Sequence, residues 1–321
     1  RVSLACESCC SRQLGDGSRE CGHGRSGVNS WWVVVNPSAG KGRDLTRHVE
    51  SALDARSINY EVRTSEDADS IGGIIAEGRS LGYGAFLAVG GDGTANLIVN
   101  QLLDTAWRQS PTLGILPAGS GSDFVRTFAI PNELEAAADH LLDDLRYPVD
   151  VGCLSGSFGR RYFLNAANAG IGARTVVEAE RLPDWMGSRR YLAGFWSALA
   201  RTAPGDINVD CENRTITTTG WNVVIANGQF FGGGMNVAPR AAAGDGLFDV
   251  QVYSGPRRIA PVVIRRVVRG THLTHTAVRR TTGRSVAVEI PDAWLVEADG
   301  EIVGEGPFRA EVLTGRLDFK I

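Results

Sequence analysis

Short apolar runs alternate with stretches of helical periodicity along the first half of the chain. The run at 31–35 ends at Asn36-Pro37, as a buried parallel strand does. Apolar residues within 45–53 then recur at i, i+4, i+7 and i+8, which predicts a helix that starts near residue 41 or 42. The pattern continues with predicted strands at 58–63, 85–89 and 112–116 and predicted helices at 67–78 and 94–103. This alternation predicts βαβ crossovers and a parallel sheet with helices on both faces.

The sequence pattern changes after about residue 149, where short runs of β-branched and aromatic residues dominate. Predicted strands lie at 161–168, 221–227, 247–253, 285–290, 293–297 and 316–321, and predicted helices at 189–201 and 257–269. Asn-Gly and Asp-Gly pairs at 227, 245 and 299 are typical of hairpin turns. The sequence therefore predicts an α/β protein: a parallel-sheet domain at 30–150 followed by a mostly antiparallel β-sandwich domain at 151–321.

Residues 1–29 are rich in Gly, Ser and Arg and show no hydrophobic periodicity, so we expect a disordered leader. A metal knuckle formed by Cys6, Cys9, Cys21 and His23 is the alternative, although its last spacing fits zinc sites poorly. The stretch lacks the apolar segment of a secretory signal. The two cysteines that fall in predicted strands, at 153 and 211, are expected as small buried hydrophobes in a reducing cytoplasm.

Composition limits the function classes. The 321 residues are 43% hydrophobic, which excludes a disordered chain, and no apolar run approaches the roughly 20 residues that span a bilayer. The net charge of −3 argues against nucleic acid as a partner. However, Val250 to Val288 contains eight arginines and no acid, so the rest of the chain has a net charge of −11. The helix at 257–269 is basic and amphipathic; it could lie on anionic lipid or pack on the β domain with its arginines in water.

Three glycine-rich loops follow predicted strands of the first half. They read N-P-S-A-G-K-G at 36–42, G-G-D-G-T-A-N at 90–96 and P-A-G-S-G-S-D-F at 117–124. Alone, the first could be a plain turn and the third an N-cap. An acid among glycines, as at Asp92, instead suits phosphate with Mg²⁺, because backbone N–H groups and a carboxylate are both needed there. Since the loops share one sheet edge, they predict a common site.

The second half adds F-G-G-G-M at 231–235, A-A-G-D-G-L-F-D at 242–249 and D-G-E at 299–301. For Asp245 and Asp299 taken singly, a turn is as good an interpretation as a functional site. Together, in this order, the motifs resemble the soluble diacylglycerol kinase catalytic family, which includes bacterial lipid kinases and is related to the sphingosine and ceramide kinases. The likeness runs from Trp31 to Ile321. NAD kinases share G-G-D-G-T, and the second-half motifs separate the two groups.

The resemblance implies an ATP-dependent enzyme that transfers the γ-phosphate to a lipid hydroxyl, with diacylglycerol the first expectation, on a cytoplasmic protein that binds the membrane peripherally. It implies nucleotide contacts at Asn36, Pro37, Ser38, Ala39, Gly40, Thr64, Gly91, Asp92, Gly93, Thr94, Ala95, Asn96, Leu97 and Ser120. It places magnesium at the Ala242 carbonyl, Asp245 and the Leu247 carbonyl. Glu301, with Asp299 beside it, would be the general base; Asp92 stays open as base or metal ligand.

Two departures from the family pattern stand at 120 and 122. Ser120 replaces the usual Thr and keeps the hydroxyl, whereas Ser122 replaces the usual Asn and loses an amide. Two other functions stay open: an NAD kinase-like small-molecule kinase, and a sensor that binds lipid or nucleotide without turnover. Some relatives pair as homodimers, so self-association is also an open expectation.

Overall fold

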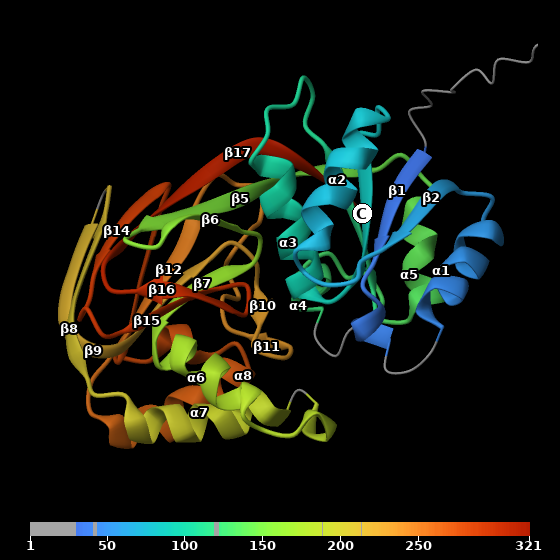
Figure 1. The fold of residues 1–321 in the computed structure, drawn as a ribbon. Helices are drawn as coiled ribbons and strands as arrows, with labels where there is room; N and C mark the ends of the chain where they lie inside the picture. The colour runs from blue at the N-terminus through green and yellow to red at the C-terminus, as the bar shows by residue number, and fades with distance from the viewer. Residues whose placement is uncertain (1–29, 41–43, 119–121, 188, 213) are drawn as a thin grey trace, which may run out of the picture.

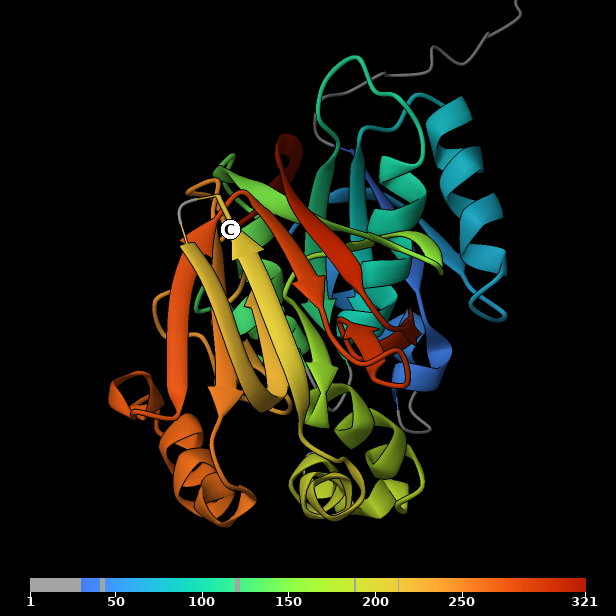
Figure 2. The same cartoon turned by 90° about the vertical axis from the view of Figure 1, so that its left-hand side faces the viewer.

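The computed structural model describes residues 30–40, 44–118, 122–187, 189–212 and 214–321. An α/β part and a β-rich part lie side by side, and the helices of the β-rich part gather on its lower side in Figures 1 and 2. The leader, with its four cysteines and His23, and Ser120 lie outside the described residues. Cys153 and Cys211 are buried free thiols in strands, as the sequence predicts.

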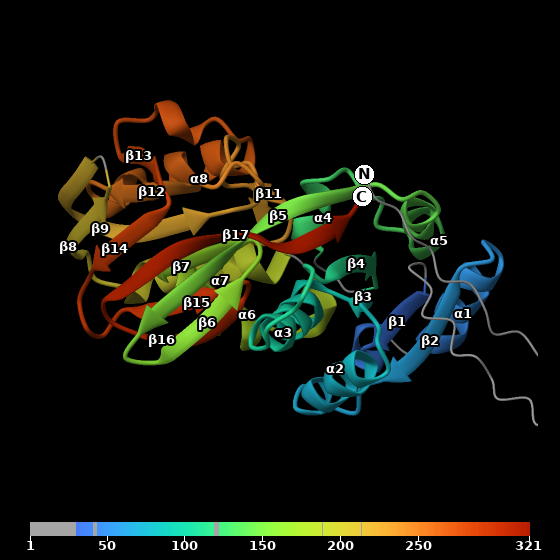
Figure 3. The ribbon, with the colours of Figure 1, turned by 90° about the horizontal axis from the view of Figure 1, so that it is seen from above.

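The first part is a parallel sheet in the order β2-β1-β3-β4. Its strands are β1 (Ser30–Val35), β2 (Asn59–Thr64), β3 (Ala85–Gly90) and β4 (Thr112–Pro117). Its helical elements are η1 (Pro37–Gly40), α1 (Leu45–Asp54), α2 (Ser70–Ser80), α3 (Asp92–Leu103), α4 (Asp123–Arg126), α5 (Leu134–Ala138) and η2 (Asp139–Leu141). The pair α1 and α5 covers one face and the pair α2 and α3 the other (Figure 3). The predicted alternation of strand and helix is confirmed.

The second part is mostly antiparallel. Its strands are β5 (Arg146–Gly156), β6 (Gly159–Phe163), β7 (Ala166–Gly170), β8 (Gly205–Cys211), β9 (Arg214–Ala226), β10 (Phe230–Phe231), β11 (Met235–Asn236), β12 (Phe248–Ser254), β13 (Val278–Gly283), β14 (Ser285–Glu289), β15 (Leu295–Ala298), β16 (Glu301–Glu305) and β17 (Phe308–Lys320). One apolar core fills the interior of this part and a second lies beneath its helices. The predicted β-sandwich class is therefore confirmed.

Six helical elements accompany these strands: α6 (Ile171–Glu180), η3 (Asp184–Met186), α7 (Arg189–Arg201), η4 (Arg257–Ile259), α8 (Ala260–Val268) and η5 (His272–Thr274). Helix α8 packs against the β-rich part through Ala260, Val263 and Val267, which join its core. This agrees with the interpretation that the basic helix packs on the β domain. The arginines in and next to this helix, at 258, 265, 266 and 269, are exposed.

Strand β17 joins the two parts. It pairs antiparallel with β5 and β14 in the β-rich part, and its end pairs parallel with β4 through Asp318 and Phe319. Because backbone ladders run across this junction, the loops of the first part and the hairpins of the second part are held at fixed positions relative to each other.

One prediction for the second part is wrong, and one helix was not predicted. The strand expected at 161–168 is two strands, β6 and β7, because the chain turns at Leu164 and Asn165, whose backbone N–H groups donate to the carboxylate of Asp299. Helix α6 was not predicted from the sequence. Gly170 has φ 94°, and an added Cβ would lie 2.6 Å from the Trp221 carbonyl oxygen, so a glycine is required there.

Candidate active site

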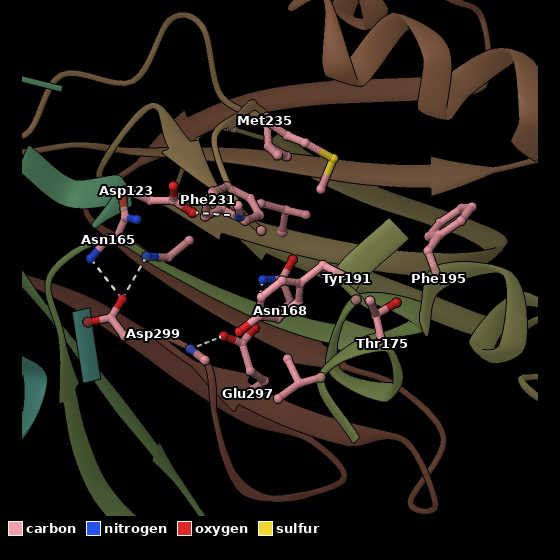
Figure 4. A pocket seen from close by; sticks show the side chains of 18 of the residues that line it. Asp123, Asn165, Asn168, Thr175, Tyr191, Phe195, Phe231, Met235, Glu297 and Asp299 are labelled. Carbon is pink, nitrogen blue, oxygen red and sulfur yellow. Dashed lines mark hydrogen bonds between the residues drawn. The ribbon is translucent and has the colours of Figure 1, made fainter. Parts of the chain in front are cut away.

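A chamber of about 580 Å³ opens at the junction of the two parts (Figure 4). One end holds five acids, contributed by β3–α3, α4 and the β15–β16 hairpin: Asp92, Asp123, Glu297, Asp299 and Glu301. The other end is apolar, with walls from α6, α7, α8 and the sheet: Ile171, Val176, Leu192, Phe195, Trp221, Val224, Phe231, Met235, Val237, Val263, Ile264 and Val267. A polar end next to an apolar cavity suits an amphipathic ligand.

Asp92 is the first residue of α3, directly after β3. Its two carboxylate oxygens accept hydrogen bonds from the backbone N–H groups of Asp123, at 2.7 Å, and Phe124, at 3.2 Å. It therefore ties the second glycine-rich loop to the start of α4. Burial, together with the nearby charge of Asp123, raises the pKa of Asp92 to about 7. Gly90 is required beside it, because an added Cβ would lie 2.4 Å from the Thr94 hydroxyl.

Asp123 connects the two parts of the molecule. Its carboxylate accepts a hydrogen bond from the backbone N–H of Gly233 at 2.8 Å and lies 3.6 Å from the Arg126 side chain. Burial raises the pKa of Asp123, against the opposing effect of these partners. The loop that supplies the N–H needs its glycines, because Gly232, Gly233 and Gly234 have φ values of 69°, 88° and 90°. The F-G-G-G-M motif thus meets the third glycine-rich loop.

Asp299 and Gly300 form the tight turn between β15 and β16, with φ values of 47° and 90°. The Asp299 carboxylate accepts four hydrogen bonds of 2.7 to 3.0 Å. Three donors are the backbone N–H groups of residues 164–166, and the fourth is the Asn96 side chain of α3. The hairpin interpretation of Asp-Gly is right, and the same residue anchors two segments from elsewhere in the chain.

Glu301 follows this turn and lines the chamber. Its carboxylate forms an ion pair with the Arg161 guanidinium, which also donates to the Asn96 side-chain oxygen at 3.2 Å. The Glu301 side chain is 39% exposed, whereas Asp92 is partly buried and its two carboxylate oxygens already accept backbone hydrogen bonds. Of the two candidate bases, Glu301 is the more accessible to a hydroxyl.

Some of the residues predicted to contact the nucleotide line the chamber, and others do not. Ser38, Ala39, Gly91, Asp92 and Gly93 line it. The Asn36 side chain connects the first two loops: its Nδ2 donates to the Thr94 hydroxyl at 3.0 Å, and its Oδ1 accepts the Ser38 N–H at 3.1 Å.

The remaining nucleotide predictions lie outside the chamber lining. Ala95 and Asn96 are buried within α3, Leu97 is partly buried there, and Pro37 is exposed on η1. Gly40 ends η1. Thr64 ends β2, with its hydroxyl 3.4 Å from that of Thr46.

The predicted magnesium residues lie in the loop between β11 and β12, away from the chamber lining. The Ala242 carbonyl accepts the N–H groups of Gly244 and Asp245, and the Asp245 carboxylate accepts the Leu247 N–H at 2.9 Å. Asp245 faces Asp150, and burial together with this second carboxylate raises the pKa of Asp150. Two neighbouring carboxylates and carbonyl oxygens are hard ligands of the kind that Mg²⁺ takes. Within the described residues, no group of three or more acidic, His or Cys side chains is arranged to hold a metal.

Sequence reasoning missed several residues of the site. Glu297 of β15 is buried, accepts a hydrogen bond from the Asn168 amide at 2.7 Å and another from the Gly300 N–H, and lies near Tyr191 of α7. Burial raises the pKa of Glu297 to about 7. An acid inside the apolar strand Leu295–Ala298 was the signal that could have identified it.

Glycine-rich loops at the strand ends of an α/β part, joined through acids to a β-rich part with an apolar chamber, define a phosphotransferase for an amphipathic acceptor. Comparison with known protein families supports this class of enzyme. The diacylglycerol kinase catalytic domain matches residues 30–154, and the YegS C-terminal NAD kinase beta sandwich-like domain matches residues 165–320. The chain belongs to the diacylglycerol kinase family of lipid kinases.

Individual relatives are distant but cover most of the chain. The "Diacylglycerol kinase" of Bacillus subtilis is 26% identical over 86% of this chain and 90% of its own length. A "Probable lipid kinase YegS-like" of Cronobacter sakazakii is 28% identical over 81% of this chain and 86% of its own length. The fold is shared with a crystal structure of a diacylglycerol kinase from Bacillus anthracis, at a TM-score of 0.69 and 20% identity over 91% of this chain and 96% of that one. A second structure from that organism has a TM-score of 0.77 at 22% identity, over 91% of this chain and 95% of that one.

Proposed function

We propose that this protein is an ATP-dependent lipid kinase that transfers the γ-phosphate of ATP to the free hydroxyl of diacylglycerol, giving phosphatidic acid. The observation that carries the proposal is the chamber, because its acidic end adjoins the glycine-rich loops and its far end is lined by apolar side chains of α7 and α8. A hydroxyl can then face the phosphate while acyl chains occupy the apolar end.

The nucleotide would be held mainly by backbone groups. Ser38 and Ala39 of η1, together with Gly91 and Gly93 at the start of the twelve-residue helix α3, present a surface with little side-chain bulk. Exposed N–H groups at such a helix start favour phosphate. Phosphoryl transfer needs mainly positioning and charge neutralisation, so a rigid loop tied to α4 by Asp92 serves this chemistry.

Glu301 is the proposed general base. Its carboxylate takes the proton of the acceptor hydroxyl as the new oxygen–phosphorus bond forms and ADP leaves; such a base contributes about 10²- to 10⁴-fold. Arg161 orients this carboxylate through their ion pair, and Asp299 fixes the turn that carries it. Asp92 is the alternative base, and its position beside the loop also suits a metal bound with ATP.

Magnesium is proposed at two places. When bound with ATP, Mg²⁺ would neutralise phosphate oxygens, and Asp92, which lines the chamber within the second glycine-rich loop, would be its ligand. A second ion on the Ala242, Asp245 and Leu247 oxygens would relieve the repulsion between Asp245 and Asp150. Because that loop lies outside the chamber lining, such an ion would stabilise the fold and would not contact the reacting phosphate.

We further propose that a cytoplasmic form of the protein binds membranes peripherally through α7 and α8. Five large apolar side chains are exposed on η3, α7 and α8: Trp185 (84%), Leu192 (46%), Trp196 (44%), Val262 (49%) and Val268 (51%). Exposed arginines at 189, 258, 265, 266 and 269 accompany them. Tryptophan beside arginine suits the boundary of an anionic bilayer. No helix in the described part of the chain is long and apolar enough to span one.

Vesicle sedimentation tests this membrane proposal. The double variant Trp185→Ala/Trp196→Ala should bind phosphatidylglycerol vesicles at least about tenfold more weakly, since each tryptophan buries a large apolar surface at the interface. The matched control is Leu81→Ala, an apolar residue that is 58% exposed and directly follows α2. Binding that is indifferent to anionic lipid and salt, or equal losses in both variants, would contradict the proposal.

A kinase assay with γ-labelled ATP tests the reaction. Label should enter phosphatidic acid when diacylglycerol is supplied in mixed micelles, and none should enter NAD in detergent-free buffer. Label on NAD alone would instead support the NAD kinase-like alternative. ATP binding without label transfer to any acceptor would leave a sensor, and both kinase functions would be wrong.

A further inference from the structure

Glu297 is a buried acid for which the proposed reaction has no use. It is 5% exposed, and its carboxyl oxygens accept hydrogen bonds from Asn168 and Gly300, neither of which carries a positive charge. Within the part of the chain that the structure describes, Glu297 has no ion-pair partner, and a buried carboxyl in that situation costs several kcal/mol unless it is neutral or serves a ligand. Its position on the chamber wall points to a ligand.

Glu297 belongs to the acidic end of the chamber and lies on the side of Asp299 that faces the apolar end. Gly300 joins it to the turn that carries Asp299 and Glu301, and Tyr191 of α7 lies beside it (Figure 4). One turn further along α7, Phe195 belongs to the apolar end. Along the chamber, the position of the reacting hydroxyl therefore comes first, next to the other acids; Glu297 comes next, and the apolar wall comes last. In a diacylglycerol, the groups between the hydroxyl and the acyl chains are esters.

We propose that Glu297, held by Asn168 and Gly300, donates a hydrogen bond from its carboxyl to the acceptor lipid's ester carbonyl nearest the reacting hydroxyl. The proposal rests on the proposed lipid kinase function and deepens it, since it makes Glu297 a residue that selects ester-linked acceptors. An ester offers only acceptor oxygens, so the carboxyl must be the donor, and only its protonated form has an O–H.

The surroundings of Glu297 favour that protonated form. Burial is the main cause that raises its pKa to about 7, and the charge of Asp299 in the same hairpin adds to it. Tyr191 of α7 is a neutral neighbour whose own pKa is raised by burial, against the opposing charge of Arg190, which also lines the chamber. From helix α6, which also packs on β15, Arg174 and Glu178 pair with each other at 3.0 Å. Acyl chains that fill the apolar end would exclude water and favour the neutral acid further.

Two variants separate this role from a structural one. Glu297→Gln keeps a donor, as an amide N–H, whereas Glu297→Leu keeps the approximate size and removes it. For dioctanoylglycerol in mixed micelles, Glu297→Leu should raise KM about tenfold, as expected for one lost hydrogen bond, with kcat changed less than about threefold. Glu297→Gln should keep the wild-type KM. Dodecanol, which has no ester, should inhibit wild type and both variants with the same inhibition constant.

The pH profile gives a second readout. KM of the wild type for dioctanoylglycerol should rise as pH increases from 6 to 8, because the donor is lost, and KM of Glu297→Gln should stay flat. Glu305→Leu, at the exposed far end of the same hairpin, is the matched control and should behave as wild type. Thermal unfolding of each variant shows whether it is folded; if Glu297→Leu is not, the Gln profile alone decides.

Three results would overturn the proposal while leaving the lipid kinase intact. They are an unchanged KM in Glu297→Leu, an equal loss of dodecanol inhibition, and a Gln variant as impaired as the Leu variant, which would show that the ionised carboxylate is needed. If the wild type phosphorylates only lipids without an ester, this inference is wrong and the kinase stands. If it phosphorylates no lipid, the proposed function fails and the inference with it.

Discussion

Asp299 offers the sharpest test of how the hairpin positions the site. Asp299→Asn keeps one oxygen and replaces the other by an amide. Asn tolerates the left-handed φ of 47°, so the backbone is not perturbed. In the aspartate, Oδ1 accepts the Asn165 and Ala166 N–H groups and Oδ2 accepts the Leu164 N–H and the Asn96 amide. The variant can satisfy two of these four donors.

Hydrogen bonds to a charged group are worth about 1.5 to 3 kcal/mol each, so two lost bonds cost up to about 6 kcal/mol. Burial raises the pKa of Asp299, which means that removing the charge returns part of this cost. We expect a net loss near 3 kcal/mol. At about 2 to 4 °C per kcal/mol for a domain of this size, Tm should fall by about 6 to 12 °C.

Differential scanning calorimetry at pH 7 measures this change. Asp292→Asn, an exposed aspartate in the loop before β15, is the matched control and should shift Tm by less than about 2 °C. If Asp299→Asn also unfolds within about 2 °C of the wild type, the four hydrogen bonds do not hold the hairpin, and the assignment of Asp299 as an anchor is wrong.

Three further predictions follow from the same geometry. Glu301→Gln should lower kcat about 10²- to 10⁴-fold with the ATP Kd within about threefold, by isothermal titration; a loss of ATP binding would make Glu301 a nucleotide residue. Because the pKa of Glu297 is raised from 4.5 to about 7 on folding, its contribution to stability is lost as pH rises through that range. Urea unfolding should therefore show a free-energy decrease from pH 5 to pH 8 that is smaller in Glu297→Gln by up to about 3 kcal/mol, and parallel profiles would refute this. Gly233→Ala, at φ 88°, should cost about 1 to 2 kcal/mol and lower kcat by displacing Asp123, whereas unchanged kcat would separate that loop from the reaction.

The first half of the fold could be predicted because its signals are local. A run such as 31–35 specifies a buried strand. The loop after β3 leads directly into a helix, and its glycines are evident in the sequence. The glycine-rich loops were expected to meet at one sheet edge, and Ser38, Gly91 and Asp123 do line one chamber.

The rest of the site depends on contacts between distant segments. The Asp92 carboxylate binds a backbone N–H 31 residues away, and Asp123 binds one 110 residues away. Neither partner leaves a mark in the local sequence, because any residue has an N–H. Helix α6 was not predicted for a related reason, because it is stabilised by the tertiary packing of residues such as Ile171 and Ala173.

The central claim is that the chamber between α7, α8 and the acids holds the acceptor lipid. Photolysis of a diazirine-bearing diacylglycerol with the wild-type protein, followed by peptide mass spectrometry, tests it directly. The account predicts adducts on chamber residues such as Phe195, Val263 and Val267, and their loss when unlabelled diacylglycerol competes. Adducts confined to outward-facing residues such as Trp185 and Val268, or adducts that persist under competition, would contradict it.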